Sequence, residues 1–363
     1  MKQIAAFLVL TVMVLGLAAY GRDTLDHWID KTELPPVLTE VGAEVRARDG
    51  TLLRAFSVED GRVRLAAQLE QVDPKFTEML IAFEDKRYYH HNGIDLCAAA
   101  RAVFQAVRHG RVVSGGSTLT MQVARLLENS GTGTVTGKLR QVRLALALER
   151  QLSKQQILTL YLHHAPYGGA VEGLRAASLM WFGKDPARLT QTEAALLIAL
   201  PQSPEARRPD RHPEAARAAR ARVLNRLGLQ PYNHQSDVPR KLRPLPLDAP
   251  HVAAGLRSRA PASLRHDTTI DSQLQKQMQL LSQRAVAGLA KGMSAAILVA
   301  DHHTGEVLAY VGSPAFSAQN GTLGFVDMVT AVRSPGSTLK PLVYGLAFDE
   351  GLVHPDTLIN DAP

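Results

Sequence analysis

Apolar residues recur at helical spacing through the middle of this chain. Several of the segments begin with Asp, Ser or Thr, which are favoured at the start of a helix. Strands do not alternate with helices there, so a doubly wound parallel sheet is excluded. The pattern predicts a mainly α domain. The segments with helical spacing are 75–83, 95–109, 118–127, 137–151, 154–162, 172–182 and 192–200.

The character of the chain changes after residue 205. Arg and Pro become frequent, and one helix is expected at 213–227. Farther on, a helix at 274–289 precedes two short apolar segments around Thr304-Gly305, which predict a hairpin. A short strand at 43–48 opens the first domain. The expected organisation is a signal anchor at 1–22, a stalk at 23–42, a first domain at 43–205, a basic linker at 206–265 and the N-terminal part of a second domain at 266–363.

The N-terminus combines Lys2 with an apolar stretch over residues 4–20. This length is close to the minimum for a membrane-spanning helix, and a cleaved signal peptide is the alternative. We expect an uncleaved, single-pass anchor in the cytoplasmic (inner) membrane with the domains that follow it on the periplasmic, outer side.

The net positive charge of the chain indicates which kinds of partner it can bind. Lys and Arg number 41 against 34 Asp and Glu, which gives a net charge of +7. No nucleic-acid-binding motif accompanies this charge, so we expect no nucleic acid partner and assign the basic surface to phosphates of a membrane or a substrate. Cys97 is the single cysteine, so an intrachain disulfide is excluded.

The segment 84–93 carries the first candidate chemistry. The apolar residues 79–83 predict a buried helix face, and His91-Asn92-Gly93 predicts a turn. Glu84 would then lie at the mouth of a cleft, where its carboxylate could take a proton from a sugar hydroxyl. By itself the pair Glu84-Asp85 fits a solvated helix end equally well.

Further segments agree with this interpretation in order and spacing. Residues 115–122 read Gly-Gly-Ser-Thr-Leu-Thr-Met-Gln, and residues 157–168 read Ile-Leu-Thr-Leu-Tyr-Leu-His-His-Ala-Pro-Tyr-Gly. With a third block over 176–204, they resemble motifs of the family 51 peptidoglycan glycosyltransferases across about residues 40–205. His163 stands where that family usually has asparagine.

One motif departs from the family pattern. Relatives have Arg-Lys-x-x-Glu, whereas residues 137–141 here read Gly-Lys-Leu-Arg-Gln. Lys138 is kept, but Gln141 replaces the second acid, and an amide carries no negative charge at neutral pH. Gln141, together with 165–169 and 208–213, is similar to the 1C type of class A penicillin-binding proteins rather than to the 1A and 1B types.

The resemblance implies a lysozyme-like, mostly helical fold and polymerisation of lipid II into a growing glycan strand. It makes Glu84 the general base for the acceptor hydroxyl, with Arg125 and Lys138 on the departing diphosphate. The residues alone leave two alternatives open. Arg125 could be a solvated helix residue, and Ser117 and Thr118 could only cap the helix that follows them. The substrate-binding residues that the resemblance implies are Asp85, His91, Ser117, Thr118, Gln122, Arg125, Lys138 and Gln141.

The second domain contains Ser337-Thr338-Leu339-Lys340, a Ser-x-x-Lys motif that resembles the start of a penicillin-binding transpeptidase domain of the serine β-lactamase type, an α/β fold. At i and i+3 of a helix, Ser337 would be the nucleophile and Lys340 its base. The sequence ends before any Ser-x-Asn or Lys-Thr-Gly element. We therefore expect an incomplete site that would bind β-lactams only in a complete domain.

No resident metal is predicted. The His-His pairs lack the acidic or cysteine neighbours of a zinc site. Magnesium or manganese on the substrate diphosphate stays open, although no carboxylate cage is visible in the sequence. Two rival functions also stay open: a lysozyme-like lytic enzyme with Glu84 as acid, and a non-catalytic lipid II-binding scaffold suggested by Gln141.

Overall fold

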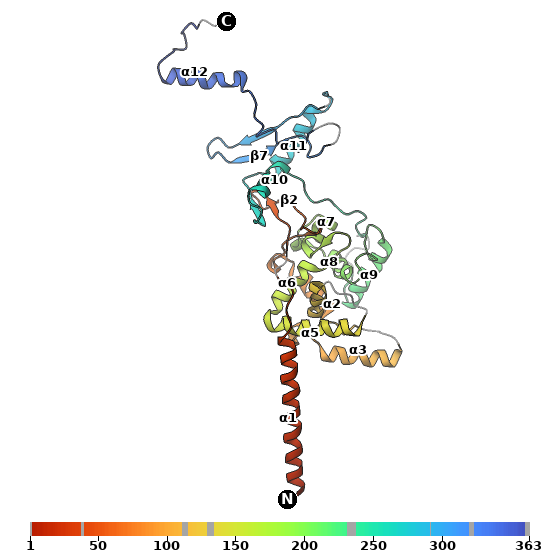
Figure 1. The fold of residues 1–363 in the computed structure, drawn as a ribbon. Helices are drawn as coiled ribbons and strands as arrows, with labels where there is room; N and C mark the ends of the chain where they lie inside the picture. Colours follow the sequence, from red (N-terminus) through yellow and green to blue (C-terminus); the bar gives the residue numbers. More distant parts are fainter. Residues whose placement is uncertain are drawn as a thin grey trace. The chain divides into compact units, whose positions relative to one another are not determined.

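The computed structural model describes residues 2–37, 40–110, 115–128, 134–230, 237–290, 292–318 and 323–359 (Figure 1). The chain divides into two compact units. Unit 1 comprises Met1–Asp248 and Leu256–Thr268, and unit 2 comprises Ala249–Gly255 and Thr269–Pro363. The candidate glycosyl-transfer residues all fall within unit 1.

The N-terminal helix α1 (Lys2–Asp30) corrects one expectation. A spanning segment needs about 20 consecutive apolar residues, but α1 becomes polar after Tyr20. Its C-terminal part contacts α5 (Val135–Gln151), where Arg150 pairs with Asp26 and Asp30. Among the residues that the structure describes, no helix is both long and apolar enough to cross a membrane. This finding contradicts the predicted localisation by a single-pass anchor.

Unit 1 is built mainly from helices, and the prediction of a mainly α domain is confirmed. The central helix is α8, whose residues 194–199 are all buried, because Ala, Leu and Ile occupy every side of it. It packs against α2, α7 and α9. The helices are α2 (Pro74–Glu84), α3 (Leu96–His109), α4 (Leu119–Glu128), α5, α6 (Lys154–His164), α7 (Leu174–Phe182), α8 (Gln191–Ala199) and α9 (Pro213–Arg226).

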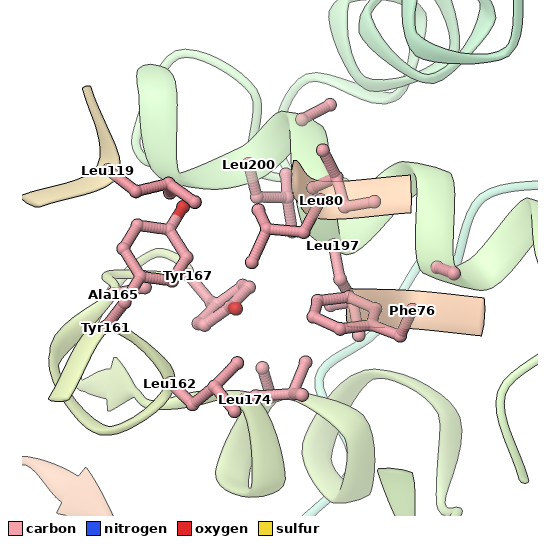
Figure 2. Close-up of a cluster of buried hydrophobic side chains, with 14 of the residues drawn as sticks. Phe76, Leu80, Leu119, Tyr161, Leu162, Ala165, Tyr167, Leu174, Leu197 and Leu200 are labelled. Atoms are coloured by element: carbon pink, nitrogen blue, oxygen red, sulfur yellow. The ribbon is translucent and has the colours of Figure 1, made fainter. Parts of the chain in front are cut away.

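The core of unit 1 combines side chains from segments far apart in the sequence (Figure 2). Phe76 and Leu80 of α2 meet Leu197 of α8, and Tyr161 and Tyr167 are fully buried nearby. Each fully buried side chain of this size stabilises the fold by roughly 1.5–3 kcal/mol. The core therefore fixes α2, and with it the position of Glu84 at the end of that helix.

Local signals explain where the helices begin. Ser153 and Gln156 form a capping box at the start of α6, and Thr190 and Glu193 form another at α8. Asp73 caps α2 by accepting a hydrogen bond from the Lys75 N–H. These caps account for the agreement between predicted and observed helix starts.

Unit 1 also contains two small sheets, each of which pairs strands from early and late segments of the chain. In the first, β1 (Glu44–Arg46) pairs antiparallel with β2 (Leu52–Ala55) and parallel with β5 (Arg265–Asp267). In the second, β3 (Val63–Arg64) pairs parallel with β4 (Val171–Glu172). The predicted strand at 43–48 is confirmed as β1, but its partner β5 straddles the boundary expected at residues 265–266 and belongs to unit 1.

Unit 2 contains the predicted hairpin, in which β6 (Ile297–Ala300) pairs antiparallel with β7 (Val307–Val311). The helix α11 (Ser272–Val286) packs against β7, and its Gln275 side chain bonds to the backbone of that strand. The Gln275 amide donates to Tyr310 O at 2.9 Å and accepts from Tyr310 N–H at 2.7 Å. The helix α12 (Lys340–Asp349) also belongs to unit 2, whereas α10 (Pro250–Arg259), which the sequence did not predict, is divided between the two units.

Candidate active site

A polar pocket of about 320 Å³ lies in unit 1, where α2 ends beside α4 and α5. Four separate segments of the chain line it. Six of the residues that the sequence singled out lie in this pocket, so the structure brings most of the predicted site together. The lining residues are Glu84, Ser117, Met121, Gln122, Arg125, Lys138, Gln141 and Gln202.

Helical spacing explains why α4 and α5 each contribute two polar side chains. Gln122 and Arg125 are three residues apart on α4, and Lys138 and Gln141 are three apart on α5. Residues at this spacing share one helix face. Since α4 packs against α5, the two faces supply a common wall of amides and cations.

The Glu84 carboxylate is held by two amides. Gln122 Nε2 donates to Glu84 Oε2 at 2.8 Å, and Gln202 Nε2 donates to Glu84 Oε1 at 2.7 Å. Both contacts suit an ionised carboxylate, which is acceptor-only. Burial, followed by the Glu84 charge, raises the pKa of the Tyr161 phenol well above its ordinary value, so Tyr161 stays neutral.

Lys138 forms the cationic side of the pocket together with Arg125. Its Nζ donates to Ser117 Oγ at 2.6 Å and lies 3.5 Å from Gln141 Oε1. Burial lowers the Lys138 pKa, and the neighbouring Arg125 charge lowers it further. Lys138 and Arg125 are close enough to affect each other, and the hydrogen-bond partners of Lys138 are a neutral hydroxyl and a neutral amide. This arrangement favours the binding of an anion.

Three predicted substrate-binding residues lie behind the pocket wall instead of lining it. Asp85 is 6% exposed and accepts from the Leu119 N–H at 3.0 Å, and His91 Nε2 lies 3.0 Å from both of its carboxylate oxygens. Thr118 donates to Gly93 O at 2.6 Å and accepts from the Met121 N–H at 3.1 Å. These bonds fix the start of α4 against the segment that follows Glu84.

Gly93 is required by this arrangement. Its φ is +91°, and a Cβ on it would lie 2.8 Å from Ala145 O of α5. Its carbonyl is the acceptor for Thr118. The turn predicted at His91-Asn92-Gly93 therefore lies directly against the backbone of α5, and its Gly93 carbonyl holds the start of α4 through Thr118.

Gln141 is almost completely buried, with 2% of its surface exposed. Its Oε1 faces Lys138, while its Nε2 is buried without a hydrogen-bond partner. An unsatisfied buried amide costs about 1–3 kcal/mol. Gln141 therefore lines the pocket with its Oε1 toward Lys138 and an unsatisfied donor buried behind it.

The donor set does not fit a divalent cation. Hard cations such as Mg²⁺ prefer several carboxylate or carbonyl oxygens, whereas the described lining offers one carboxylate, Glu84, with Arg125 and Lys138 beside it. The described residues also contain no group of three or more His, Cys, Asp or Glu arranged to hold a metal. We assign no step to a metal.

The Ser-x-x-Lys motif lies in unit 2. Ser337 belongs to a 3-10 turn, Gly336–Leu339, and Lys340 begins α12. Both side chains are exposed. Ser337 therefore lies in the turn that precedes α12, and the predicted pairing with Lys340 stays a prediction.

Two lining residues were not assigned by sequence reasoning. Gln202 stands in the third of the blocks that carried the resemblance, but nothing in its local pattern showed that it would reach Glu84 across 118 positions. Met121 has the periodicity of a core residue and is 3% exposed. Gln202 could not have been found without the packing of α8 against α2.

Comparison with known proteins agrees with this architecture. Residues 49–228 match the transglycosylase family, and residues 295–363 match the penicillin binding protein transpeptidase domain. Penicillin-binding protein 1C of Escherichia coli (strain K12) is 43% identical over 360 residues, which cover 96% of this chain and 45% of that protein. Penicillin-binding protein 1F of Bacillus subtilis (strain 168) is 29% identical over 99% of this chain and 53% of that protein.

A transglycosylase domain followed by transpeptidase sequence places the chain in the class A penicillin-binding protein family. Within it, the similarity to penicillin-binding protein 1C agrees with the type suggested by Gln141. The chain spans about half the length of these two curated relatives.

Proposed function

We propose that this chain is a peptidoglycan glycosyltransferase that polymerises lipid II into glycan strands during cell-wall synthesis. The observation that carries the proposal is the pocket in which one carboxylate, Glu84, shares about 320 Å³ with Arg125 and Lys138. A base and an anion site in one pocket are what glycosyl transfer from a diphosphate-linked donor requires. The family match over residues 49–228 supports the same activity.

Glu84 supplies the base in this proposal. The 4-hydroxyl of the acceptor sugar transfers its proton to a Glu84 oxygen as its own oxygen attacks the anomeric carbon of the donor. The bond between that carbon and the diphosphate oxygen breaks, and the configuration inverts. Because Gln122 and Gln202 occupy only one lone pair on each carboxylate oxygen, lone pairs remain for the hydroxyl proton.

The cationic side of the pocket takes the leaving group. As the diphosphate departs, its negative charge increases, and Arg125 and Lys138 stabilise that charge. Lys138 is partly desolvated and repelled by Arg125, so an arriving anion also relieves an unfavourable pair of like charges.

Gln141 completes the anion site as a donor. Its Nε2 has no protein partner, so we assign it to an oxygen of the diphosphate, with Ser117 beside it. Where relatives place an acid, this chain supplies an N–H, which suits direct binding of an anion by the protein.

Asp85, His91 and Thr118 serve the reaction by holding the site together. Since their hydrogen bonds join the start of α4 to the segment after α2, they keep Gln122 within reach of Glu84. We therefore propose positioning roles for them in place of direct substrate contact.

Incubation of the purified chain with labelled lipid II, followed by sizing of the products, tests the function. We expect long glycan strands from the wild type and at least a 100-fold lower rate from Glu84→Gln, because general base catalysis contributes about 10²–10⁴-fold. Glu78→Gln, an exposed glutamate on the same helix, is the matched control and should keep full activity.

The same experiment separates the rival functions. A lytic enzyme would shorten added glycan strands and leave lipid II monomeric. A scaffold would retain lipid II without converting it. Polymerisation at more than a few per cent of the wild-type rate by Glu84→Gln would remove Glu84 from the role of base.

A further inference from the structure

Gln202 connects the candidate base to an arginine that does not line the pocket. It ends the 3-10 turn Leu200–Gln202, which follows α8 directly. Its Nε2 donates to Glu84 Oε1 at 2.7 Å, and its Oε1 accepts from Arg207 Nη1 at 2.9 Å. The three side chains thus form a continuous chain of hydrogen bonds from guanidinium to carboxylate.

The chemistry of the three groups fixes the direction of this chain. A guanidinium can only donate, and an ionised carboxylate can only accept. A neutral amide between them satisfies both in one orientation: its oxygen faces Arg207, and its nitrogen faces Glu84. Arg207 therefore prevents the Gln202 amide from rotating by 180° and presenting its oxygen to Glu84.

Arg207 is itself anchored at the end of α8. The same Nη1 that donates to Gln202 also donates to Ala199 O at 2.7 Å. Ala199 is the last residue of α8, where backbone carbonyls lack partners within the helix. One guanidinium nitrogen thus joins the helix end to the side chain that holds Glu84.

The hydrogen bond from Arg207 matters because the Gln202 side chain is exposed to solvent. Gln202 is exposed, whereas Arg207 is partly buried. An exposed glutamine side chain exchanges readily between protein and water partners, and ordering it has an entropic cost. A second hydrogen bond to a fixed partner reduces the freedom that Gln202 still has to lose.

We propose that Gln202 and Arg207 are positioning residues that hold the Glu84 carboxylate in the orientation in which it receives the acceptor proton. The proposal rests on the glycosyltransferase function proposed above and adds two residues to it. Gln122 holds one carboxylate oxygen from α4, and the Gln202–Arg207 pair holds the other from the end of α8. The base is therefore fixed between α4 and the end of α8, two elements that are far apart in the sequence.

Steady-state kinetics on lipid II test the proposal. Gln202→Met keeps the length of the side chain and removes its polar atoms, and Arg207→Met removes the anchor. We expect each to lower kcat about tenfold with KM within twofold of wild type, since an exposed hydrogen bond to a charged group is worth about a factor of ten. Gln155→Met and Arg211→Met, at exposed positions in the same unit, are the matched controls and should change neither constant.

A conservative variant separates positioning from folding. Arg207→Lys retains a cationic donor near Gln202, so we expect it to recover at least half of the kcat lost in Arg207→Met, at an unchanged melting temperature. The two losses should also be non-additive, because Arg207 acts through Gln202. A rise in KM alone in Gln202→Met would assign Gln202 to substrate binding and overturn the proposal, as would unchanged kcat in both single variants.

Crystal structures of the wild type and Arg207→Met provide a readout that does not depend on turnover. We expect the Gln202 amide and the Glu84 carboxylate to lose their single conformation when Arg207 is replaced. Identical Glu84 positions in the two structures would overturn the proposal. A wild-type chain that makes no glycan would instead defeat the proposed function, and the crystallographic comparison would still decide whether Arg207 orders Glu84.

Discussion

Individual residues decide the chemistry of the pocket, and Lys138 is the most informative of them. It lies between Ser117, Gln141 and the repelling charge of Arg125. In relatives with an acid in place of Gln141, the lysine would have a counter-ion within the protein. Here its charge is left for the ligand.

We therefore expect Lys138→Ala to lower the rate of lipid II polymerisation by about 10²–10³-fold, the usual effect of removing one electrostatic stabiliser. Lys138→Arg should lose less, because it keeps a cation for the diphosphate. Initial rates with labelled lipid II measure both. Equal losses in the two variants would show that Lys138 acts through packing.

His163 is a second residue whose position has a measurable consequence. Its Nε2 accepts from the Ala67 N–H at 2.9 Å. Burial, followed by the neighbouring His164, lowers the pKa of His163 to about 4 from 6.5. Between those two values the unfolded chain binds a proton that the folded chain does not, so stability falls as the pH decreases from about 6.5 toward 4.

The expected loss from His163 is about 2 kcal/mol of unfolding free energy between pH 7 and pH 4.5. His163→Gln can still accept from Ala67 but does not titrate, so its loss over this range should be smaller by that amount. Urea unfolding at both pH values measures it. The exposed His90→Gln is the control, and an acid loss as large in His163→Gln as in wild type would refute the assignment.

At the scale of elements, one buried ion pair connects β1 to α7. Glu44 is 2% exposed and pairs with Arg175, which also donates to Ala66 O at 3.0 Å. Arg46 donates to the same carboxylate from β1. These contacts fasten the edge sheet to the helical core.

Glu44→Leu should lower the unfolding free energy by about 3–5 kcal/mol, because it leaves Arg175 buried without its carboxylate. The double variant Glu44→Leu/Arg175→Met should lose less than the sum of the two single losses, since the charge left unpaired in Glu44→Leu is then also absent. Denaturant unfolding of all three variants measures the coupling.

The exposed pair Arg240–Asp237, with side chains 74% and 40% exposed, is the matched control. Arg240→Met should cost no more than about 1 kcal/mol, as is usual for surface pairs. A loss from Glu44→Leu as small as this would mean that the contact between β1 and α7 does not depend on the ion pair.

At the scale of the whole molecule, the two units differ in how complete their sites are. Unit 1 closes a pocket around Glu84, whereas Ser337 and Lys340 are exposed in unit 2. We expect a fluorescent penicillin to leave Ser337 unlabelled in the 363-residue chain, because a serine nucleophile needs groups that bind the antibiotic and stabilise charge. Covalent labelling that disappears in Ser337→Ala would contradict this expectation, while labelling that persists would come from another residue.

Local sequence determined most of the helices and most of the residues that line the pocket. Segments such as 137–151 and 154–162 carry their periodicity and caps within one stretch, so α5 and α6 could be predicted. The same local order placed Lys138 and Gln141 on one helix face. Glu84 was found because an apolar helix ends beside it.

The sequence misled where local composition is not sufficient. The apolar residues 4–20 predicted a membrane anchor, but α1 continues to Asp30 with charged residues that bind Arg150 of α5. Residues 266 and 267 were expected to open the second domain, but with Arg265 they form β5 in the sheet of β1, within unit 1. The pairing of β5 with β1 joins positions more than 200 apart in the chain, which local periodicity does not encode.

The sequence by itself determined the helical class, the family resemblance, and the candidate base and cations, because each depends on residues close together in the chain. Only the tertiary structure decided that Gln202 and Arg207 reach Glu84, that Asp85 and Thr118 lie behind the pocket, and that the Gln141 amide is left without a partner. The physical reason is that hydrogen bonds and burial are set by how α2, α4, α5 and α8 pack, and packing joins positions that the sequence keeps far apart.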